Sequence, residues 1–393
     1  MHGSDNLSNG RRILGLAMIL AGIFCSLDQL TKGNALRADF GNEVAYAATS
    51  QAGGEMPLVE NAKAETRAVT GTLDATFRGI LAQVEKPEWV GYSVDETAGE
   101  RSMCCGNWND GAACGTCRLE KDRETTGGTT HSDGSVKLEG ARRLVVLFRL
   151  EAKQVDRIRV ASEDCTLDAG GLPFLWLTGV KPSESVALLT TYVQGAEFER
   201  HGDHHNVGNG ALTAIALHAD ASADKAMESF VAPEQREELR RQAAFWLGVA
   251  RGKGGLIVLQ RMAKGDPSSD VRAHVTFALS VSHEPGAIEE MIRMAHDDSS
   301  SHVRGQALFW LAQKAGKKAV GTITGAIEND PDTDVKKKAV FALSQLPKDE
   351  GVPKLIEVAQ TNRNPEVRKQ AMFWLGQSND PRALEFFERV LTK

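Results

Sequence analysis

Apolar residues recur in the second half of the chain with a fixed period of 32 residues. The period is marked by a phenylalanine, at Phe245, Phe277, Phe309, Phe341 and Phe373. Two residues after each phenylalanine stands a leucine, and six residues before it stands an aliphatic residue. This spacing places the three columns on one face of an α-helix. A fixed period of this length is typical of stacked repeats.

A second set of apolar columns lies eleven, fourteen and seventeen residues after each phenylalanine. The first copy has Leu256, Leu259 and Met262 at these places, and the last copy has Leu384, Phe387 and Val390. Turn-forming segments such as "RGKGG" and "PKDEG" separate the two sets. Each copy is therefore predicted to be a hairpin of two helices, a first helix around the phenylalanine and a second helix after the turn.

Two polar columns accompany the apolar ones. An acidic or amide residue stands eleven positions before each phenylalanine, at Glu234, Asp266, Asp298, Asp330 and Asn362. Five positions before each phenylalanine stands a basic residue, at Arg240, Arg272, Arg304, Lys336 and Arg368. This pair, six residues apart, resembles that of HEAT repeats, particularly the short repeats of phycobilisome lyases. The resemblance covers residues 234–393 and implies an α–α superhelix with a ladder of polar contacts between successive hairpins.

The residue after the phenylalanine alternates between large and small, as Trp246, Ala278, Trp310, Ala342 and Trp374. Such alternation lets successive layers pack without voids, so we interpret the tryptophans as core, with Trp310 buried between Ala278 and Ala342. The alternative is a stripe of aromatic rings exposed to a ligand.

HEAT-like solenoids present their second helices along a concave surface, which is a natural groove for another polypeptide. The residues thirteen and sixteen after each phenylalanine are expected on the outer face of that helix. They vary from copy to copy, as a binding face would, although a merely solvated face would vary too. The candidate protein-binding residues are Arg261, Glu290, Arg293, Lys354 and Arg389.

The first half of the chain differs in character. Arg11 and Arg12 precede a short apolar stretch, so residues 1–27 are interpreted as a secretory signal peptide or an uncleaved membrane anchor. Residues 28–85 are interpreted as a variable linker with a helix around 73–84. Residues 86–182 predict a small β-rich module that contains cysteines, with strands at 143–150 and 155–160. Residues 183–233 predict a degenerate capping repeat, and the fold as a whole is mainly α.

Five cysteines follow the N-terminal segment 1–27, namely Cys104, Cys105, Cys114, Cys117 and Cys165. In an exported protein the first interpretation is disulfide bonding. A zinc site is the alternative, although adjacent Cys104 and Cys105 cannot supply a second Cys-x2-Cys knuckle. A redox role for the pair Cys114 and Cys117 is a third.

A second cluster of candidate metal ligands lies in the glycine-rich segment "ERHGDHHNVGNG". Imidazole and carboxylate groups are good ligands for zinc or iron. Nothing in the spacing fixes these side chains on one helix face, so solvated polar residues are the competing interpretation. The candidates are His201, Asp203, His204 and His205.

The formal net charge of −6 is unevenly distributed, because residues from 235 onward carry 24 basic and 20 acidic side chains. Neither half is basic enough to indicate nucleic-acid binding. We find no catalytic triad, phosphate-binding loop or paired carboxylate motif. The sequence therefore favours an exported scaffold that binds proteins, without a cofactor and with no membrane contact beyond the N-terminal segment. The competing hypothesis is a metal- or thiol-dependent enzyme with its site at the cysteines or histidines.

Overall fold

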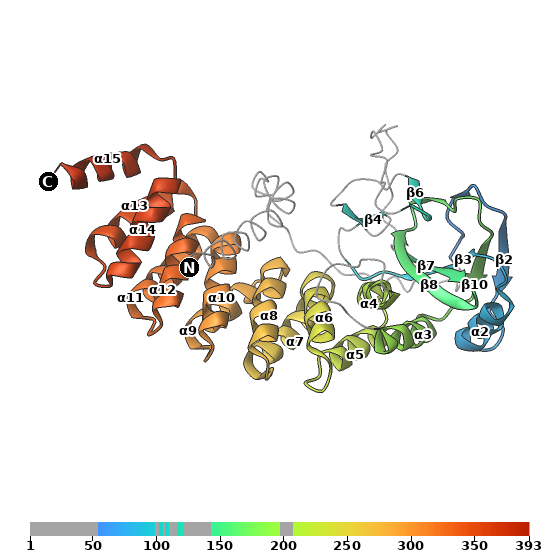
Figure 1. The fold of residues 1–393 in the computed structure, drawn as a ribbon. Helices are drawn as coiled ribbons and strands as arrows, with labels where there is room; N and C mark the ends of the chain where they lie inside the picture. The colour runs from blue at the N-terminus through green and yellow to red at the C-terminus, as the bar shows by residue number, and fades with distance from the viewer. Residues whose placement is uncertain are drawn as a thin grey trace, which may run out of the picture. The chain divides into compact units, whose positions relative to one another are not determined.

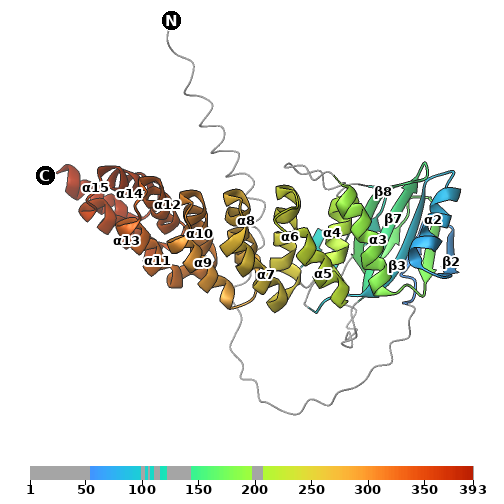
Figure 2. The same cartoon turned by 90° about the horizontal axis from the view of Figure 1, so that it is seen from below.

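The computed structural model describes residues 54–98, 102–104, 107–109, 116–121, 143–196 and 207–392. Element labels are those of Figure 1. Strands come first along the chain, and helices α3 to α15 follow. Figure 2 shows the helices from α6 onward in two rows, with α6, α8, α10, α12 and α14 in one and the odd-numbered helices in the other.

The sheet module is built on a five-stranded sheet with the order β2-β10-β3-β7-β8. Its strands are β2 (Ala64–Ala68), β3 (Glu88–Asp95), β7 (Arg143–Glu151), β8 (Gln154–Ser162) and β10 (Phe174–Thr178). Strand β10 runs parallel to β2 and β3, whereas β3, β7 and β8 are antiparallel to one another. A three-stranded sheet of β1 (Val59–Glu60), β9 (Thr166–Asp168) and β6 (Thr116–Arg118) and a pair of β4 (Ser102–Cys104) and β5 (Asn107–Asn109) complete the strands described.

Both faces of the five-stranded sheet are covered. Val146 and Phe148 of β7 pack into the core shared with the helices α2 (Leu73–Gln83), α3 (Pro182–Gly195) and α4 (Val207–Leu217). Val145 and Leu147 point to the opposite face, into a second core with Cys117 and Cys165. Because both faces of the sheet are covered by apolar side chains, the sequence of β7 is a continuous apolar run rather than an alternation of apolar and polar residues.

The stretch 28–85, interpreted from sequence as a linker, takes part in the sheet module within its described portion. Strand β2 pairs along its whole length with β10, and β1 pairs with β9. All five residues of β2 are exposed, so the strand lacks the apolar alternation by which a strand is found in sequence. Helix α2 lies within the segment where the sequence indicates a helix.

The helices α4 and α5 (Ala221–Phe230) connect the sheet to the repeats. Ile215, Leu217, Met227 and Phe230 are all fully buried. Helix α4 crosses β8 so closely that a Cβ atom on Gly210 would lie 2.2 Å from the carbonyl oxygen of Ile158. One continuous core runs from the sheet through this hairpin to the last repeat. The hairpin therefore closes the end of the solenoid that faces the sheet.

Five helical hairpins follow at the predicted period. The first helices are α6 (Glu237–Ala250), α8 (Ser269–Val281), α10 (Ser301–Ala315), α12 (Thr333–Ser344) and α14 (Pro365–Gln377). The second helices are α7 (Gly252–Gly265), α9 (Gly286–Asp297), α11 (Val320–Asn329), α13 (Lys348–Thr361) and α15 (Pro381–Leu391), with a short 3₁₀ turn, η1 (Gly316–Ala319), before α11. The predicted α–α solenoid after a small β-rich module is confirmed.

The prediction for the outer face of the second helices is wrong in part. Val258, Glu290 and Phe386, all thirteen residues after a phenylalanine, are buried. In the last copy the expected inward residues Leu384 and Val390 are exposed instead, at 62% and 46%. Val258, Glu290 and Phe386 are buried because their helices, α7, α9 and α15, contact a neighbouring second helix as well as their own first helix, so the buried stripe extends beyond three columns.

Candidate interaction surface along the first helices of the repeats

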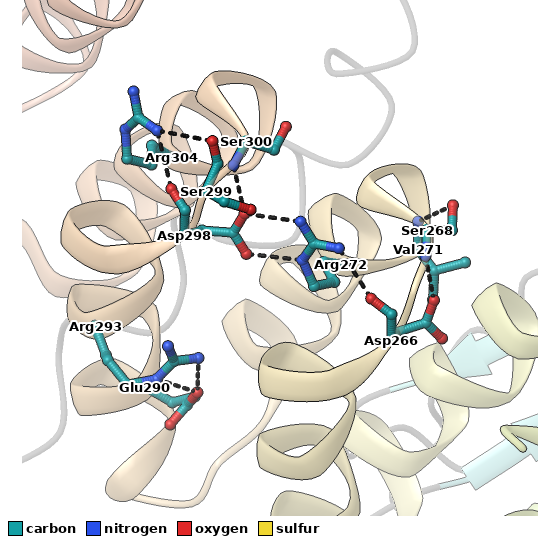
Figure 3. Close-up of polar contacts among 10 residues, drawn as sticks. All are labelled: Asp266, Ser268, Val271, Arg272, Glu290, Arg293, Asp298, Ser299, Ser300 and Arg304. Atoms are coloured by element: carbon teal, nitrogen blue, oxygen red, sulfur yellow. Dashed lines mark hydrogen bonds and ion pairs between the residues drawn. The ribbon is translucent and has the colours of Figure 1, made fainter. Parts of the chain in front are cut away.

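The repeats are held in register by a ladder of buried ion pairs, part of which Figure 3 shows. Arg240 contacts Asp266 of the next copy with its Nε 2.8 Å and its Nη2 3.0 Å from the carboxylate. Arg272 and Asp298 repeat the arrangement at 2.9 and 3.0 Å, as do Arg304 and Asp330 at 2.7 and 3.0 Å. The predicted ladder between hairpins is confirmed, and the two-pronged geometry fixes the position of each copy on the next.

Each arginine also donates within its own copy. Nη1 of Arg272 donates to the carbonyl of Asp266 at 2.9 Å, and Nη1 of Arg304 donates to that of Asp298 at 2.9 Å (Figure 3). One side chain therefore joins the turn before its own first helix to the corresponding turn of the following copy.

The burial of Asp298 is compensated by its hydrogen bonds. Burial alone would raise the pKa of Asp298, but hydrogen bonds from Arg272 and the backbone N–H of Ser300 lower it below its usual value. The same hydrogen bond raises the pKa of Arg272. The pair is thus a fixed structural contact with both partners charged.

The ladder weakens at the last junction. Lys336 replaces arginine there, and its Nζ donates to the carbonyl of Glu328 at 2.8 Å. Asn362 replaces the aspartate, yet it still accepts from the backbone N–H of Asn364 at 2.9 Å, as Asp266 does from that of Ser268. The last copy therefore lacks this ion pair, although Asn364 Nδ2 still donates to Thr333 Oγ1 of the preceding copy at 3.1 Å.

A second ladder, which we call the aromatic ladder, follows the C-terminal halves of the first helices. It consists of Phe245, Trp246, Phe277, Phe309, Trp310, Phe341, Phe373 and Trp374. The rings of Phe245 and Phe277 are stacked at 5.8 Å, and Phe277 lies 4.8 Å from Trp310. Trp310 is joined to Phe309 at 4.9 Å, and the same sequence of contacts then repeats one pair of copies later.

The aromatic ladder is only half-buried, and its last ring, Phe373, is 55% exposed. The prediction that Trp310 is buried between Ala278 and Ala342 is therefore wrong. Both alanines are fully buried, but the indole lies outside them against the rings of Phe277 and Phe309. Because the alanines leave room, the neighbouring phenylalanine and the tryptophan meet at the surface rather than in the core.

A signal in the sequence could have revealed this exposure. The residues three positions before each phenylalanine, which share its side of the helix, are all polar, namely Gln242, His274, Gln306, Lys338 and Gln370. Gln313 and Gln345, four positions after a phenylalanine, lie within 3.5 Å of one another through their side-chain amides. The aromatic ladder is therefore an apolar ridge bordered by amides, which is the composition of an interface centre with a polar edge.

The five candidate binding residues lie elsewhere, on the second helices. Glu290 is only 5% exposed and accepts from Arg293 Nε at 2.8 Å on the same helix, as Figure 3 shows. Arg261 pairs with Glu228 of α5, and Lys354 pairs with Glu357 at 2.8 Å. Arg389 is exposed on α15. None of these side chains contributes to the aromatic ladder.

A buried polar relay, which sequence reasoning missed, joins the sheet to α3 and the end of α4. Tyr92 and Ser185 lie 2.6 Å apart through their oxygens, and Ser185 Oγ lies 2.8 Å from Nε2 of His218. His218 Nδ1 donates to the carbonyl of Ala214 at 2.6 Å, so Nε2 is the unprotonated nitrogen and accepts from Ser185, which in turn accepts from Tyr92. Burial lowers the pKa of His218 to about 4.

The cysteine and histidine candidates are only partly described. Cys117 and Cys165 are buried in the second sheet core and are disulfide sulfurs rather than free thiols. Cys104 ends strand β4, whereas Cys105, Cys114, His201, Asp203, His204 and His205 lie outside the described residues. In the ranges that the structure describes, no group of three or more potential ligands is placed to hold a metal ion. None of the helices in those ranges has the length and apolarity that a bilayer crossing requires.

Comparisons with known proteins agree with this architecture. The family of HEAT repeats matches residues 322–393. Among solved structures, the CpcE–CpcF complex of phycocyanin lyase from Nostoc sp. PCC7120 is 21% identical with a TM-score of 0.31, and the alignment covers 39% of this chain and 99% of that chain. Kap95p in its complex with RanGDP is 19% identical with a TM-score of 0.35, over 55% of this chain and 33% of that chain.

Human deoxyhypusine hydroxylase is 15% identical with a TM-score of 0.27, and the alignment covers 53% of this chain and 90% of that chain. No curated protein matches the chain significantly. Identities this low concern the fold alone.

Proposed function

We propose that this HEAT-repeat solenoid is a scaffold that holds a partner polypeptide along its aromatic ladder. The observation that carries the proposal is the row of eight ring side chains in mutual contact, partly buried along five successive first helices and exposed at its last ring, Phe373. Contiguous exposed apolar surface is uncommon on soluble proteins and marks interaction sites. Aromatic side chains are also the residues that most often dominate binding energy at protein interfaces.

The ion-pair ladder supports this function by making the surface rigid. Arg–Asp contacts fix α6 to α8, α8 to α10 and α10 to α12 at their N-terminal ends, so the rings at the C-terminal ends of these helices keep their spacing without a ligand. A preformed surface loses less conformational entropy on binding than one that must be ordered. The repeat period thus sets a regular spacing of rings that an extended partner can follow.

We also propose that the protein acts outside the cytoplasm, as residues 1–27 predict. Disulfide bonding of the buried Cys117 and Cys165 supports this location, because disulfides persist in oxidising compartments.

Site-specific photo-crosslinking tests which row of helices binds the partner. A benzophenone amino acid is placed at the exposed Gln242 or Lys338, each three residues before a ring of the ladder, and at the exposed Arg261 or Glu357 on the second helices. We expect the same partner to crosslink at Gln242 and Lys338 and not at Arg261 or Glu357. Crosslinking at the second helices alone would instead assign binding to the opposite row.

A further inference from the structure

A pocket lies between the last two copies, where the aromatic ladder reaches Trp374. Its volume is about 270 Å³. The end of α12, the following turn, helix α13 and the end of α14 form its walls. The apolar part of the lining comes from Leu343, Leu346, Val352, Leu355 and Trp374.

Trp374 lines this pocket, and its indole carries a hydrogen-bond donor that is not used. Its Nε1–H is buried and has no hydrogen-bond partner among the described residues. The ring is held by Phe341 at 4.8 Å and Phe373 at 4.9 Å. A buried donor without an acceptor is unfavourable, and tryptophan N–H groups usually find a partner when buried. The missing acceptor is therefore one that a ligand can supply.

The other polar groups of the lining do not supply that acceptor. Ser344 donates to the carbonyl of Phe341 at 2.7 Å, and Ser378 donates to that of Leu375 at 2.7 Å. The amide of Gln345 donates to Ser344 Oγ at 3.1 Å. Gln377 is exposed and makes no side-chain hydrogen bond with the part of the chain that the structure describes.

The charge at the pocket is positive. Lys348 is the charged residue of the lining, and no carboxylate belongs to it. The acidic groups nearby have other partners, because Glu350 pairs with Lys317 at 2.7 Å and Asp380 pairs with Arg382 at 2.8 Å. Asp349 lies 3.6 Å from the same Arg382. An ammonium group and an indole N–H beside apolar walls suit an apolar ligand that carries a carboxylate.

We propose that this pocket binds the C-terminal residue of the partner polypeptide, with an apolar side chain among the leucines and its α-carboxylate toward Trp374 Nε1–H and Lys348. The inference rests on the proposed function. A C-terminal apolar residue carries both required features, whereas an aspartate or glutamate side chain has the carboxylate without the apolar group. The volume lies just below the range of roughly 300–1,000 Å³ that is usual for drug-sized ligands and cofactors, which favours a ligand of one or two residues.

Titration followed by NMR tests the proposal with two tripeptides, acetyl-Gly-Gly-Leu with a free C-terminus and the same peptide as its C-terminal amide. We expect the free acid to move the indole N–H resonance of Trp374 downfield in a saturable way. The amide should bind at least tenfold more weakly. The resonance is assigned by its absence in Trp374→Phe, a change that keeps an aromatic ring and removes the donor.

Matched variants test the pocket, with the methyl resonances of Leu355 as the readout. Leu384→Ser changes an exposed residue of α15 that belongs neither to the pocket lining nor to the aromatic ladder, and it should leave the affinity unchanged. Trp374→Phe should abolish saturable binding, and Lys348→Gln should remove the preference for the acid over the amide.

An unshifted Trp374 resonance, or equal affinities for acid and amide in the wild type, would overturn the inference. Failure of this pocket is distinguishable from failure of the scaffold function, because crosslinking at Gln242 and Lys338 does not depend on Trp374. If the partner crosslinks there and the peptide does not bind, the ladder is the docking surface and the pocket is not an anchor for a C-terminus.

Discussion

Replacing Asp266 with alanine should lower the free energy of unfolding by about 3–5 kcal/mol, because it leaves a buried arginine without its counter-charge. The side chains of Arg240 and Asp266 are 4% and 2% exposed, so water cannot replace the lost carboxylate. The same carboxylate also accepts from the backbone N–H of Ser268 at the start of α8. Urea denaturation of wild type and variant measures the loss.

Asn362→Ala is the matched control for that prediction. Asn362 stands at the equivalent place in the last copy and accepts the equivalent backbone hydrogen bond from Asn364, without a two-pronged arginine contact. Its loss should cost about 1 kcal/mol, the usual net contribution of one hydrogen bond. Equal losses in the two variants would mean that the ion-pair ladder does not hold the copies together.

Acid should destabilise the fold in the range where histidine, but not aspartate, takes up a proton. Burial lowers the pKa of His218 from its model-peptide value of 6.5 to about 4, and that of His274 to about 4 as well. Between pH 6.5 and about pH 4, each of these histidines binds a proton in the unfolded chain but not in the native state. The free energy of unfolding therefore falls as the pH decreases. His218 alone should cost about 2 kcal/mol by pH 5 and roughly 3 kcal/mol by pH 4 relative to pH 7.

His218→Gln isolates the contribution of the polar relay to this acid sensitivity. The variant should be less stable than wild type at neutral pH. Its free energy of unfolding should fall less between pH 7 and pH 5, because only His274, and no longer His218, then binds a proton in the unfolded chain alone. Urea midpoints at pH 7, 6 and 5 for both proteins measure the difference. An unchanged pH dependence would show that His218 is protonated in the native state or does not contribute.

The pattern of residue columns in the repeats could be predicted because most columns make the same contacts from copy to copy. The acidic and basic columns carry the resemblance to HEAT repeats, which implies the Asp266–Arg240 type of pair, and Leu247 and Leu375 are buried as their spacing requires. Such features depend on local periodicity and on identical neighbours. They are therefore accessible to sequence reasoning.

Other features depend on contacts between segments far apart in the chain, which no local pattern encodes. Tyr92, Ser185 and His218 are brought together by the sheet, α3 and α4, and none of them stands in a recognisable motif. The exposure of the aromatic ladder was missed for a different reason. The alternation of tryptophan and alanine predicts a buried column, although the polar residues three positions before each phenylalanine mark that side of the helix as its boundary with solvent.

The affinity of the crosslinked partner for two exposed variants tests the central claim most directly. Phe373→Ser removes the 55% exposed last ring of the aromatic ladder, and Leu384→Ser removes a comparably exposed residue, at 62%, from α15. If the ladder is the docking surface, Phe373→Ser should weaken binding roughly tenfold or more, as removal of an interface aromatic does, while Leu384→Ser changes it less than about twofold. Undiminished binding of Phe373→Ser, or an equal loss in Leu384→Ser, would contradict the account.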